Sequence, residues 1–275
     1  MFTVSMASIF VVFCYLLICT VNLGYGDRIP PRYVINLDLP PENRWDKVID
    51  DYRELIPAVI EEIHHYVPRL LRPLVWWIDK NIILKEFPEE YAREIRGIAA
   101  RSGLHIGEVI LYTAVTFALN VGIYTGQKHG SFSISINERY SGAYIDTILM
   151  ELYTHFKKLV TLTIRMALEE KNTFEEAREM LIKEHFIAPS YLIIAGTKSG
   201  QACIITRDRW ESVDLECTDP QNDRWFLVET NFDHWEVDKD KRRRTAEKAL
   251  QRIGRYAITY KEMLRILSLH PVKNK

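Results

Sequence analysis

The stretch GEVILYTAVTFALNVGIYTGQ, residues 107–127, constrains the fold of this chain more than any other segment. It carries no charged residue from Val109 to Gln127. Its first half continues an amphipathic helix, whereas its second half is typical of a strand that leads into a glycine turn. Because no turn residue separates the two halves, the pattern changes abruptly between Tyr112 and Thr113.

The residues before this point predict a helical region. A short strand is expected over residues 33–39, and short helices divided by prolines are expected over residues 42–112. In one of these helices Tyr91, Ile95, Ile98 and Ala99 share a face, Gly103 ends the helix, and the next begins near His105. The dividing prolines are Pro57, Pro68, Pro73 and Pro88.

The residues after this point predict a β-rich α+β domain. Apolar Phe132, Ile134 and Ile136 alternate with polar residues, as in a half-buried strand. Two buried strands are expected to form a hairpin that turns at residues 197–200, and residues 224–235 predict another strand.

Helices complete this predicted domain. They are expected over residues 144–170 and over a segment whose N-cap is Thr173, with Glu176 in the capping-box position. Two more helices close the chain, and Thr245 is the expected N-cap of the first.

Composition and charge limit the classes of function that the chain can have. The net charge is -1, from 36 Lys and Arg against 37 Asp and Glu, and this balance argues against nucleic acid as the main partner.

Residues 1–26 carry a short apolar run followed by small residues, which predicts a secretory signal peptide and a location in the secretory pathway. A retained signal anchor is the alternative. A transmembrane helix over residues 109–126 is a further alternative, although its threonines, Asn120 and Gly122 lower its apolarity.

Four cysteines occur, and Cys14 and Cys19 fall within the predicted signal peptide. Cys203 and Cys217 remain and could pair in an oxidising lumen. Cys203 lies inside an apolar strand without a neighbouring histidine, so a buried, inert side chain is the favoured interpretation. Neither cysteine has the electropositive surroundings of an activated thiol.

Two further motifs have a structural and a functional interpretation. Glu61 and His65 have the i, i+4 spacing of a metal pair, but a solvated helix face is favoured, so no metal and no cofactor are predicted. Adjacent Trp76 and Trp77 cannot both face one core. Their helix predicts either contact with a membrane surface or lipid, or a helix packed between two layers.

Polar residues gather in ETNFDHW, where Glu229, Asn231, Asp233 and His234 lie at the end of the predicted strand of residues 224–235. Such residues at a strand end often form a site, although Asn and Asp also stabilise turns.

Several long motifs resemble the family of N-acylethanolamine acid amidase and acid ceramidase. INLDLPPENRW, EIRGIAARSGLHIGEVILY, VGIYTGQKHGSFSISINERY, CIITRDR, RWFLVETNFDHW and RRTAEKAL occur here in the family's order. The resemblance covers nearly the whole chain from about residue 32. It implies an N-terminal nucleophile (Ntn) hydrolase fold, a four-layer αββα core preceded by a helical prosegment that becomes the α-subunit. It also implies a lysosomal enzyme that hydrolyses fatty-acid amide lipids.

The resemblance also implies roles for particular residues. Asn231 matches the family's oxyanion-side asparagine, Arg243 its site arginine, and Glu138 a glutamate of the site. Between Asn231 and the arginine this chain is one residue shorter than the family pattern, and it has an additional arginine at 242.

The chain departs from the family at Tyr112–Thr113. The family places a CTS segment with the nucleophile here, followed by a GRN-D turn with an arginine and an aspartate; this chain has neither, and no cysteine lies between Cys19 and Cys203. We therefore predict a signal peptide (1–26), a helical α-subunit-like region (27–112) and an incomplete Ntn-hydrolase β-subunit-like domain (113–275).

The predicted function is that of an inactive homologue, because no other residue supplies the nucleophile. The family's cleavage into paired α and β subunits is not expected for this chain. Its predicted location is the lysosome or the extracellular space. The alternative is a non-enzymatic secretory protein that binds lipid or a partner through the Trp76–Trp77 helix. The choice between N-acylethanolamine and ceramide stays open.

Overall fold

The structure, a computed structural model, describes residues 31–64, 69–115, 121–139 and 159–273. The chain divides into Met1–Asn36 and a compact unit of Leu37–Lys275. The predicted signal peptide lies outside the described residues. The strand predicted over residues 33–39 is wrong, since residues 31–36 have no regular structure and residues 37–39 form a turn. Arg44 donates hydrogen bonds to the carbonyl oxygens of Leu37 (2.6 Å) and Leu39 (3.1 Å), which occupies acceptors that a strand would offer a neighbour.

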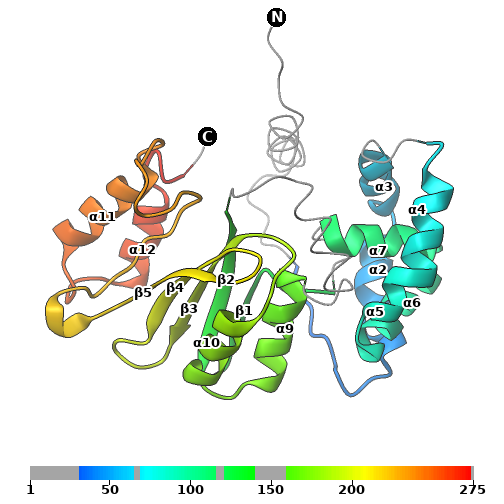
Figure 1. The fold of residues 1–275 in the computed structure, drawn as a ribbon, viewed down its shortest axis with the longest axis horizontal. Helices are drawn as coiled ribbons and strands as arrows, with labels where there is room; N and C mark the ends of the chain where they lie inside the picture. Colours follow the sequence, from blue (N-terminus) through cyan, green and yellow to red (C-terminus); the bar gives the residue numbers. More distant parts are fainter. Residues whose placement is uncertain (1–30, 65–68, 116–120, 140–158, 274–275) are drawn as a thin grey trace, which may run out of the picture. The chain divides into compact units, whose positions relative to one another are not determined.

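Short helices follow, as the proline spacing predicts (Figure 1). Pro57 and Pro73 are the second residues of their helices and Pro88 precedes another, positions where a missing N–H removes no helical hydrogen bond. The elements are η1 (Pro41–Asn43), α2 (Asp46–Tyr52), α3 (Ile56–His64), α4 (Arg72–Ile78), the π-helical turn η2 (Asp79–Ile83), α5 (Leu84–Glu86), α6 (Glu89–Ser102) and α7 (Ile106–Val115).

The predicted boundary between α6 and α7 is confirmed. Gly103 adopts a left-handed conformation (φ 76°), and its N–H donates to the carbonyl oxygen of Ala99 (3.0 Å). Helix α7 then continues through the Tyr112–Thr113 bond as far as Val115. None of the described helices is long and apolar enough to cross a membrane. Since Thr125 and Gly126 lie in a strand, the alternative of one helix over residues 109–126 is wrong.

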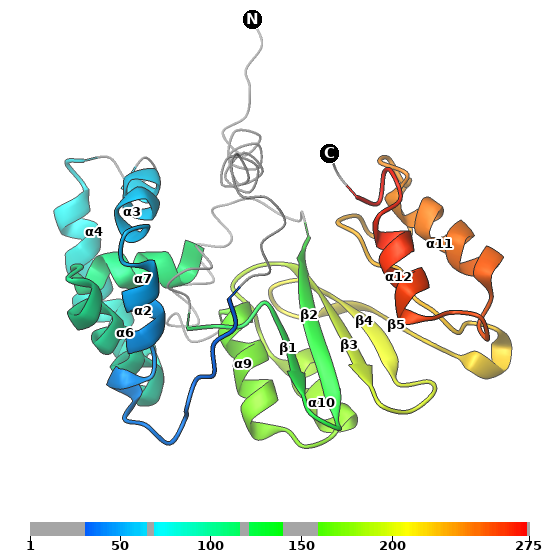
Figure 2. The same cartoon turned by 180° about the vertical axis from the view of Figure 1, so that it is seen from behind.

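A five-stranded antiparallel sheet forms the centre of the β-rich region, with its strands in chain order (Figures 1 and 2). The predicted hairpin is confirmed as β3 and β4, with the turn between them. Strand β5 extends the sheet and was not expected from the sequence. The strands are β1 (Thr125–Lys128), β2 (Phe132–Glu138), β3 (Ser190–Gly196), β4 (Ala202–Arg207) and β5 (Ser212–Cys217).

Two helices, α9 (Val160–Glu170) and α10 (Phe174–Lys183), cover one face of the sheet (Figures 1 and 2). The apolar residues that alternate along β2, β3 and β4 pack against them. The capping box of α10 is confirmed, because Thr173 Oγ1 accepts from Glu176 N–H (3.2 Å) and Glu176 Oε2 accepts from Thr173 N–H (3.3 Å). Residues 144–158 of the predicted helix lie outside the described residues.

The strand predicted over residues 224–235 is wrong. Only Arg224 makes an isolated bridge, to Asp219, and residues 225–235 are irregular. Their carbonyl oxygens are acceptors for side chains instead: Thr230 O accepts from Asn137 Nδ2 (3.2 Å) and Asp233 O from Arg243 (3.2 Å). The segment therefore binds side chains rather than a neighbouring strand.

The closing helices are α11 (Arg242–Ile253) and α12 (Tyr260–Leu267). The predicted Thr245 cap is wrong, because α11 begins at Arg242 and Thr245 lies within it. Asp238 and Asp240 accept from the N–H groups of Arg244 (2.9 Å) and Arg242 (3.0 Å), and with these carboxylates the helix starts four residues earlier than predicted, after Lys241.

A buried charge network joins α6 to α9. Glu94, whose side chain is fully buried, accepts two hydrogen bonds from Arg165, at 2.6 and 2.7 Å, and one from Arg44 at 2.9 Å. Arg165 also donates to Glu169 (2.7 Å), which accepts from Tyr91 Oη (2.7 Å). Burial raises the pKa of Glu94, but the hydrogen bonds outweigh it and hold the pKa below its ordinary value. A shared apolar core, including Ile95 and Leu162, surrounds these charges.

Candidate functional site

Two of the three residues predicted for the site, Glu138 and Asn231, meet at the C-terminal end of β2, and the third, Arg243, binds the segment that carries Asn231. Asn231 Nδ2 donates to the backbone carbonyl of Glu138 (3.0 Å), and Asn231 Oδ1 accepts from Arg242 (3.0 Å). The Asn231 amide is therefore oriented from both ends, by the end of β2 and by the first turn of α11. The side chain of Glu138 is exposed, and its described link to Asn231 is through the backbone.

Arg243 holds the irregular segment that carries Asn231. Its buried guanidinium donates to the carbonyl oxygens of Phe232 and Asp233 and to Glu229 Oε1 (3.3 Å). A positive charge in the first turn of a helix opposes the helix dipole. The position of Arg243 is explained by these acceptors rather than by the stability of α11.

Arg139 and Tyr191 fix Asp233 at the other side of the segment. Arg139 forms a two-pronged ion pair with the Asp233 carboxylate, at 2.8 Å for each oxygen, and Tyr191 Oη donates at 2.6 Å. Burial raises the pKa of Asp233, but the hydrogen bonds from Arg139 and Tyr191 outweigh it and lower the pKa below its usual value. Burial and the Asp233 carboxylate raise the pKa of Tyr191, so its hydroxyl stays protonated and donates.

Glu229 is a carboxyl of this cluster whose pKa is raised toward neutrality. Its side chain is 4% exposed, and burial raises its pKa to about 7 despite hydrogen bonds from the Thr230 N–H (2.7 Å) and Arg243. The cluster thus combines an oriented amide, a buried guanidinium and a carboxyl that changes charge near pH 7. It can bind a carbonyl oxygen or a carboxylate through N–H donors.

Sequence reasoning found part of this cluster. The ETNFDHW motif contained Glu229, Asn231 and Asp233, but Arg139 and Tyr191 were not singled out. Arg139 could have been identified as a candidate site residue from its position next to Glu138 in the motif INERY. His234 lies 3.8 Å from Asp214 and 4.0 Å from Glu216, on the β5 side of the segment.

The two cysteines of the sheet form a disulfide. Cys203 and Cys217 stand directly opposite each other in β4 and β5, with their Cα atoms 4.1 Å apart. Cys203 is buried, so the prediction of a buried, inert side chain is confirmed. A disulfide sulfur carries no thiolate, and neither residue can act as a nucleophile while the bond persists.

Trp76 and Trp77 point to different surroundings. The Trp76 ring stacks on His105 (5.5 Å between centroids), and a Cβ on Gly107 would lie 2.6 Å from the Trp76 Cα. Trp77 is 57% exposed, as are large parts of Leu70, Leu71 and Leu74. A contact with lipid through this helix would therefore be made by Trp77 and these leucines.

The possible metal pair is only partly described. His65 lies outside the described residues, and His64 Nε2 is 3.1 Å from Glu108 Oε1. No group of three potential metal ligands occurs in the part of the chain that the structure describes.

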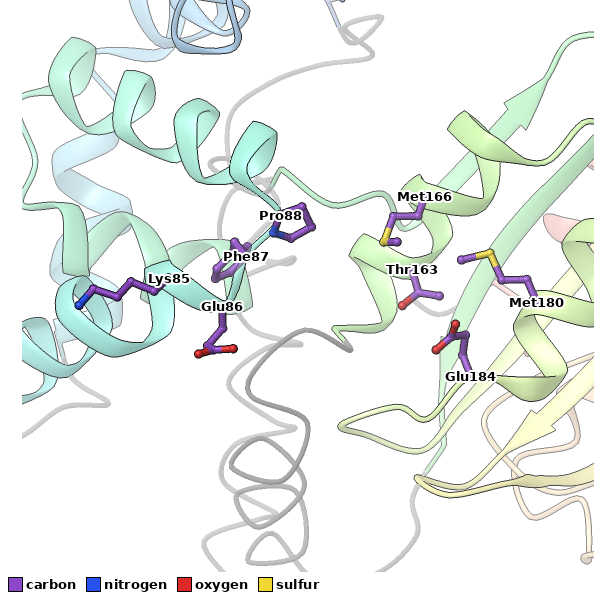
Figure 3. Close-up of a pocket in the computed structure, with 8 residues that line it drawn as sticks. All are labelled: Lys85, Glu86, Phe87, Pro88, Thr163, Met166, Met180 and Glu184. Carbon is purple, nitrogen blue, oxygen red and sulfur yellow. The ribbon is translucent and has the colours of Figure 1, made fainter.

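A cavity of about 310 Å³ lies elsewhere, at α9 and α10 (Figure 3). None of Glu138, Asn231 and Arg243 lines it, so it is separate from the cluster around Asn231. Its lining consists of Lys85, Glu86, Phe87, Pro88, Thr163, Met166, Met180 and Glu184.

Comparison with known proteins relates this geometry to a family. Residues 28–85 match the family described as the beta subunit of N-acylethanolamine-hydrolyzing acid amidase. An N-acylethanolamine-hydrolyzing acid amidase of Caenorhabditis elegans is 37% identical over 321 residues, covering 94% of this chain and 90% of that protein. The acid ceramidase of Homo sapiens is 28% identical over 319 residues, covering 89% of this chain and 81% of that protein.

A solved structure agrees with these relatives. The structure of the C. elegans ortholog of N-acylethanolamine-hydrolyzing acid amidase shares 46% identity and a TM-score of 0.52, over 58% of this chain and 68% of that one. The fold is thus α+β and of the Ntn-hydrolase class, as predicted. The chain belongs to the family of N-acylethanolamine acid amidase and acid ceramidase.

The matched family description and the predicted subunits use different labels. The match over residues 28–85 is described as a beta subunit, whereas the resemblance implied an α-subunit-like role for residues 27–112. Residues on both sides of Tyr112–Thr113 belong to the compact unit Leu37–Lys275. The division at residue 112 stays a prediction.

Proposed function

We propose that this chain binds fatty-acid amide lipids in the manner of its family but does not hydrolyse them. The names of the relatives, which refer to N-acylethanolamine and ceramide, support this ligand class. The identity of 37% to the N-acylethanolamine enzyme, against 28% to the human ceramidase, favours N-acylethanolamines. Asn231 and Arg242 are the groups proposed to donate hydrogen bonds to the amide carbonyl of the lipid. Arg243 holds the segment that carries Asn231.

The lack of a free cysteine thiol among the described residues supports the proposal that the chain does not hydrolyse amides. Amide hydrolysis by a cysteine requires a free thiolate beside a base. Cys203 and Cys217 are bonded to each other, and the other two cysteines fall in the predicted signal peptide. A segment missing at Tyr112–Thr113 accounts for the lack of a nucleophile. The alignment with the C. elegans relative supports this idea, because its 321 positions exceed the 275 residues of the chain.

The purified chain is expected to release no fatty acid from an N-acylethanolamine at acidic pH. The reason is chemical, since the oxyanion-side groups alone do not form the acyl intermediate. Fatty-acid release is measured against a Cys203→Ser plus Cys217→Ser variant, with the C. elegans enzyme as the active control. Release by this chain above the level of the double variant would refute the proposal. Sequencing the transcript across the Tyr112–Thr113 codons tests the missing segment directly.

A second candidate function rests on the exposed face of α4. A non-enzymatic secretory protein could use Trp77 and the neighbouring leucines to bind lipid or a partner, because Trp suits the headgroup zone of a bilayer. The predicted signal peptide would bring the chain into the secretory pathway, and thence to the lysosome or the extracellular space.

Replacing Trp77 by Ala is expected to weaken binding to neutral phosphatidylcholine vesicles about five- to tenfold, the contribution of one exposed aromatic ring. Co-sedimentation with vesicles measures this effect. The control is Trp76→Phe. The Trp76 ring stacks on His105, so this replacement should leave vesicle binding unchanged. Equal binding by the wild type and Trp77→Ala would exclude α4 as the lipid contact.

A further inference from the structure

The C-terminal helices differ in charge from the rest of the chain. Residues 241–275 contain 11 Lys and Arg and 2 Glu, a net charge of +9, although the whole chain carries -1. A concentration of one sign in one region indicates an interaction with a surface of the opposite sign. The remaining residues carry the compensating negative charge.

The basic residues of α11 form a stripe on its solvent face. Lys241 precedes the helix, and Arg244, Lys248 and Arg252 follow at spacings of three and four residues, which places them on one side. All four are exposed, whereas Ala246 and Leu250 face the core. Asp240 and Glu229 form ion pairs with the neighbouring Arg242 and Arg243, and no carboxylate of the described residues forms an ion pair with a side chain of the stripe.

The adjoining helix α12 exposes apolar side chains. Tyr260, Met263, Leu264 and Leu267 are spaced three or four residues apart, and all four are exposed, Tyr260 by 80% and Leu267 by 57%. Ile266 alone in this helix is buried. Tyr256, between the two helices, is 96% exposed. An amphipathic helix normally turns its apolar stripe toward a core or a partner.

We infer that α11 and α12 form a docking surface for a bilayer with anionic headgroups. The stripe supplies charge complementarity, since Lys and Arg near an anionic membrane each contribute to binding. The apolar residues and the two tyrosines supply contacts suited to the headgroup and acyl boundary. A second copy of this chain is a poorer occupant, because two such basic stripes repel each other. The surface uses none of the α4 residues, and its stripe residues differ from Arg242 and Arg243, the α11 residues that contact the segment of Asn231.

Reversing two stripe charges, with Lys248→Glu plus Arg252→Glu, is expected to weaken binding to phosphatidylserine-containing vesicles at least about tenfold. The wild type should bind these vesicles more tightly than pure phosphatidylcholine vesicles and lose that preference at high salt. Leu264→Gln plus Leu267→Gln should weaken binding by a similar factor. Lys183→Glu plus Lys198→Glu, an equal charge change elsewhere, is the control and should bind like the wild type. Thermal unfolding checks that each variant is folded.

The inference is overturned if the charge-reversed variant binds phosphatidylserine vesicles as tightly as the wild type does. Equal binding of the wild type to both vesicle types would also overturn it. Binding to heparin without binding to vesicles would assign the stripe to a soluble polyanion. Loss of binding to phosphatidylserine vesicles in Trp77→Ala, with the stripe variants unaffected, would assign the contact with anionic bilayers to α4. None of these outcomes depends on whether the chain hydrolyses amides.

Discussion

Replacing Arg165 by Met is expected to lower the free energy of unfolding by about 3 kcal/mol, the low end of the range for breaking a buried ion pair. The substitution leaves the fully buried Glu94 carboxylate without its two hydrogen bonds from Arg165. Arg44 and Trp45 still donate to Glu94, each at 2.9 Å, which places the effect at this low end. Urea denaturation followed by circular dichroism measures the change.

Two further variants separate the buried charge from general damage. Lys183→Met breaks an exposed pair with Glu179 and should cost less than about 1 kcal/mol. Glu94→Met combined with Arg165→Met should recover most of the lost stability, because the fully buried carboxylate is removed together with its partner and Arg44 keeps its ion pair with Glu90. If Arg165→Met alone costs no more than Lys183→Met, the network does not stabilise the junction of α6 and α9.

The protein is also expected to be more stable at pH 5 than at pH 7.5. The folded state raises the pKa of Glu229 from 4.5 to about 7, so between these values the folded state binds a proton that the unfolded state has lost. Stability therefore falls as the pH rises through this window and is fully retained below pH 4.5. The contribution of Glu229 to the difference is about 2 kcal/mol.

Glu229→Gln isolates this effect. The amide removes the titration while keeping the size of the side chain, so the variant should show a smaller difference between the two pH values; Glu247, whose pKa burial also raises, contributes in the same direction to both proteins. Thermal unfolding of both proteins at pH 5 and pH 7.5 provides the measurement. An undiminished pH difference in Glu229→Gln would show that other groups cause it. Carboxyls whose pKa is lowered, such as Asp233, lose stability only at more acidic pH and do not confound the comparison.

Local signals in the sequence predicted the local structure well. Thr173 and Glu176 specified a capping box, Gly103 ended a helix, and the hairpin of β3 and β4 followed from two apolar runs around a turn. In each case a few neighbouring residues determine the backbone hydrogen bonds. The resemblance to the family placed Glu138, Asn231 and Arg243 in one region, and the structure brings them together.

Features set by distant contacts were missed. Residues 224–235 have the apolar and aromatic character of a strand, but Asn137 and Arg243 take their carbonyl oxygens. Arg165 and Glu94 are 71 residues apart, and nothing local marks them as partners. Tyr191 resembles any buried strand residue until Asp233 is placed beside its hydroxyl. Strand β5 exposes Val213 and Leu215, so it lacks the buried pattern that identifies a strand of a core.

Helix α7 runs without interruption through the bond between Tyr112 and Thr113. Proteolytic cuts concentrate at exposed loop tips, where the backbone can extend, and a continuous helix does not offer such a site. We therefore expect the Tyr112–Thr113 bond itself to resist a protease that acts on the folded chain. The backbone hydrogen bonds of one helix, from Ile106 to Val115, hold the chain on both sides of that bond.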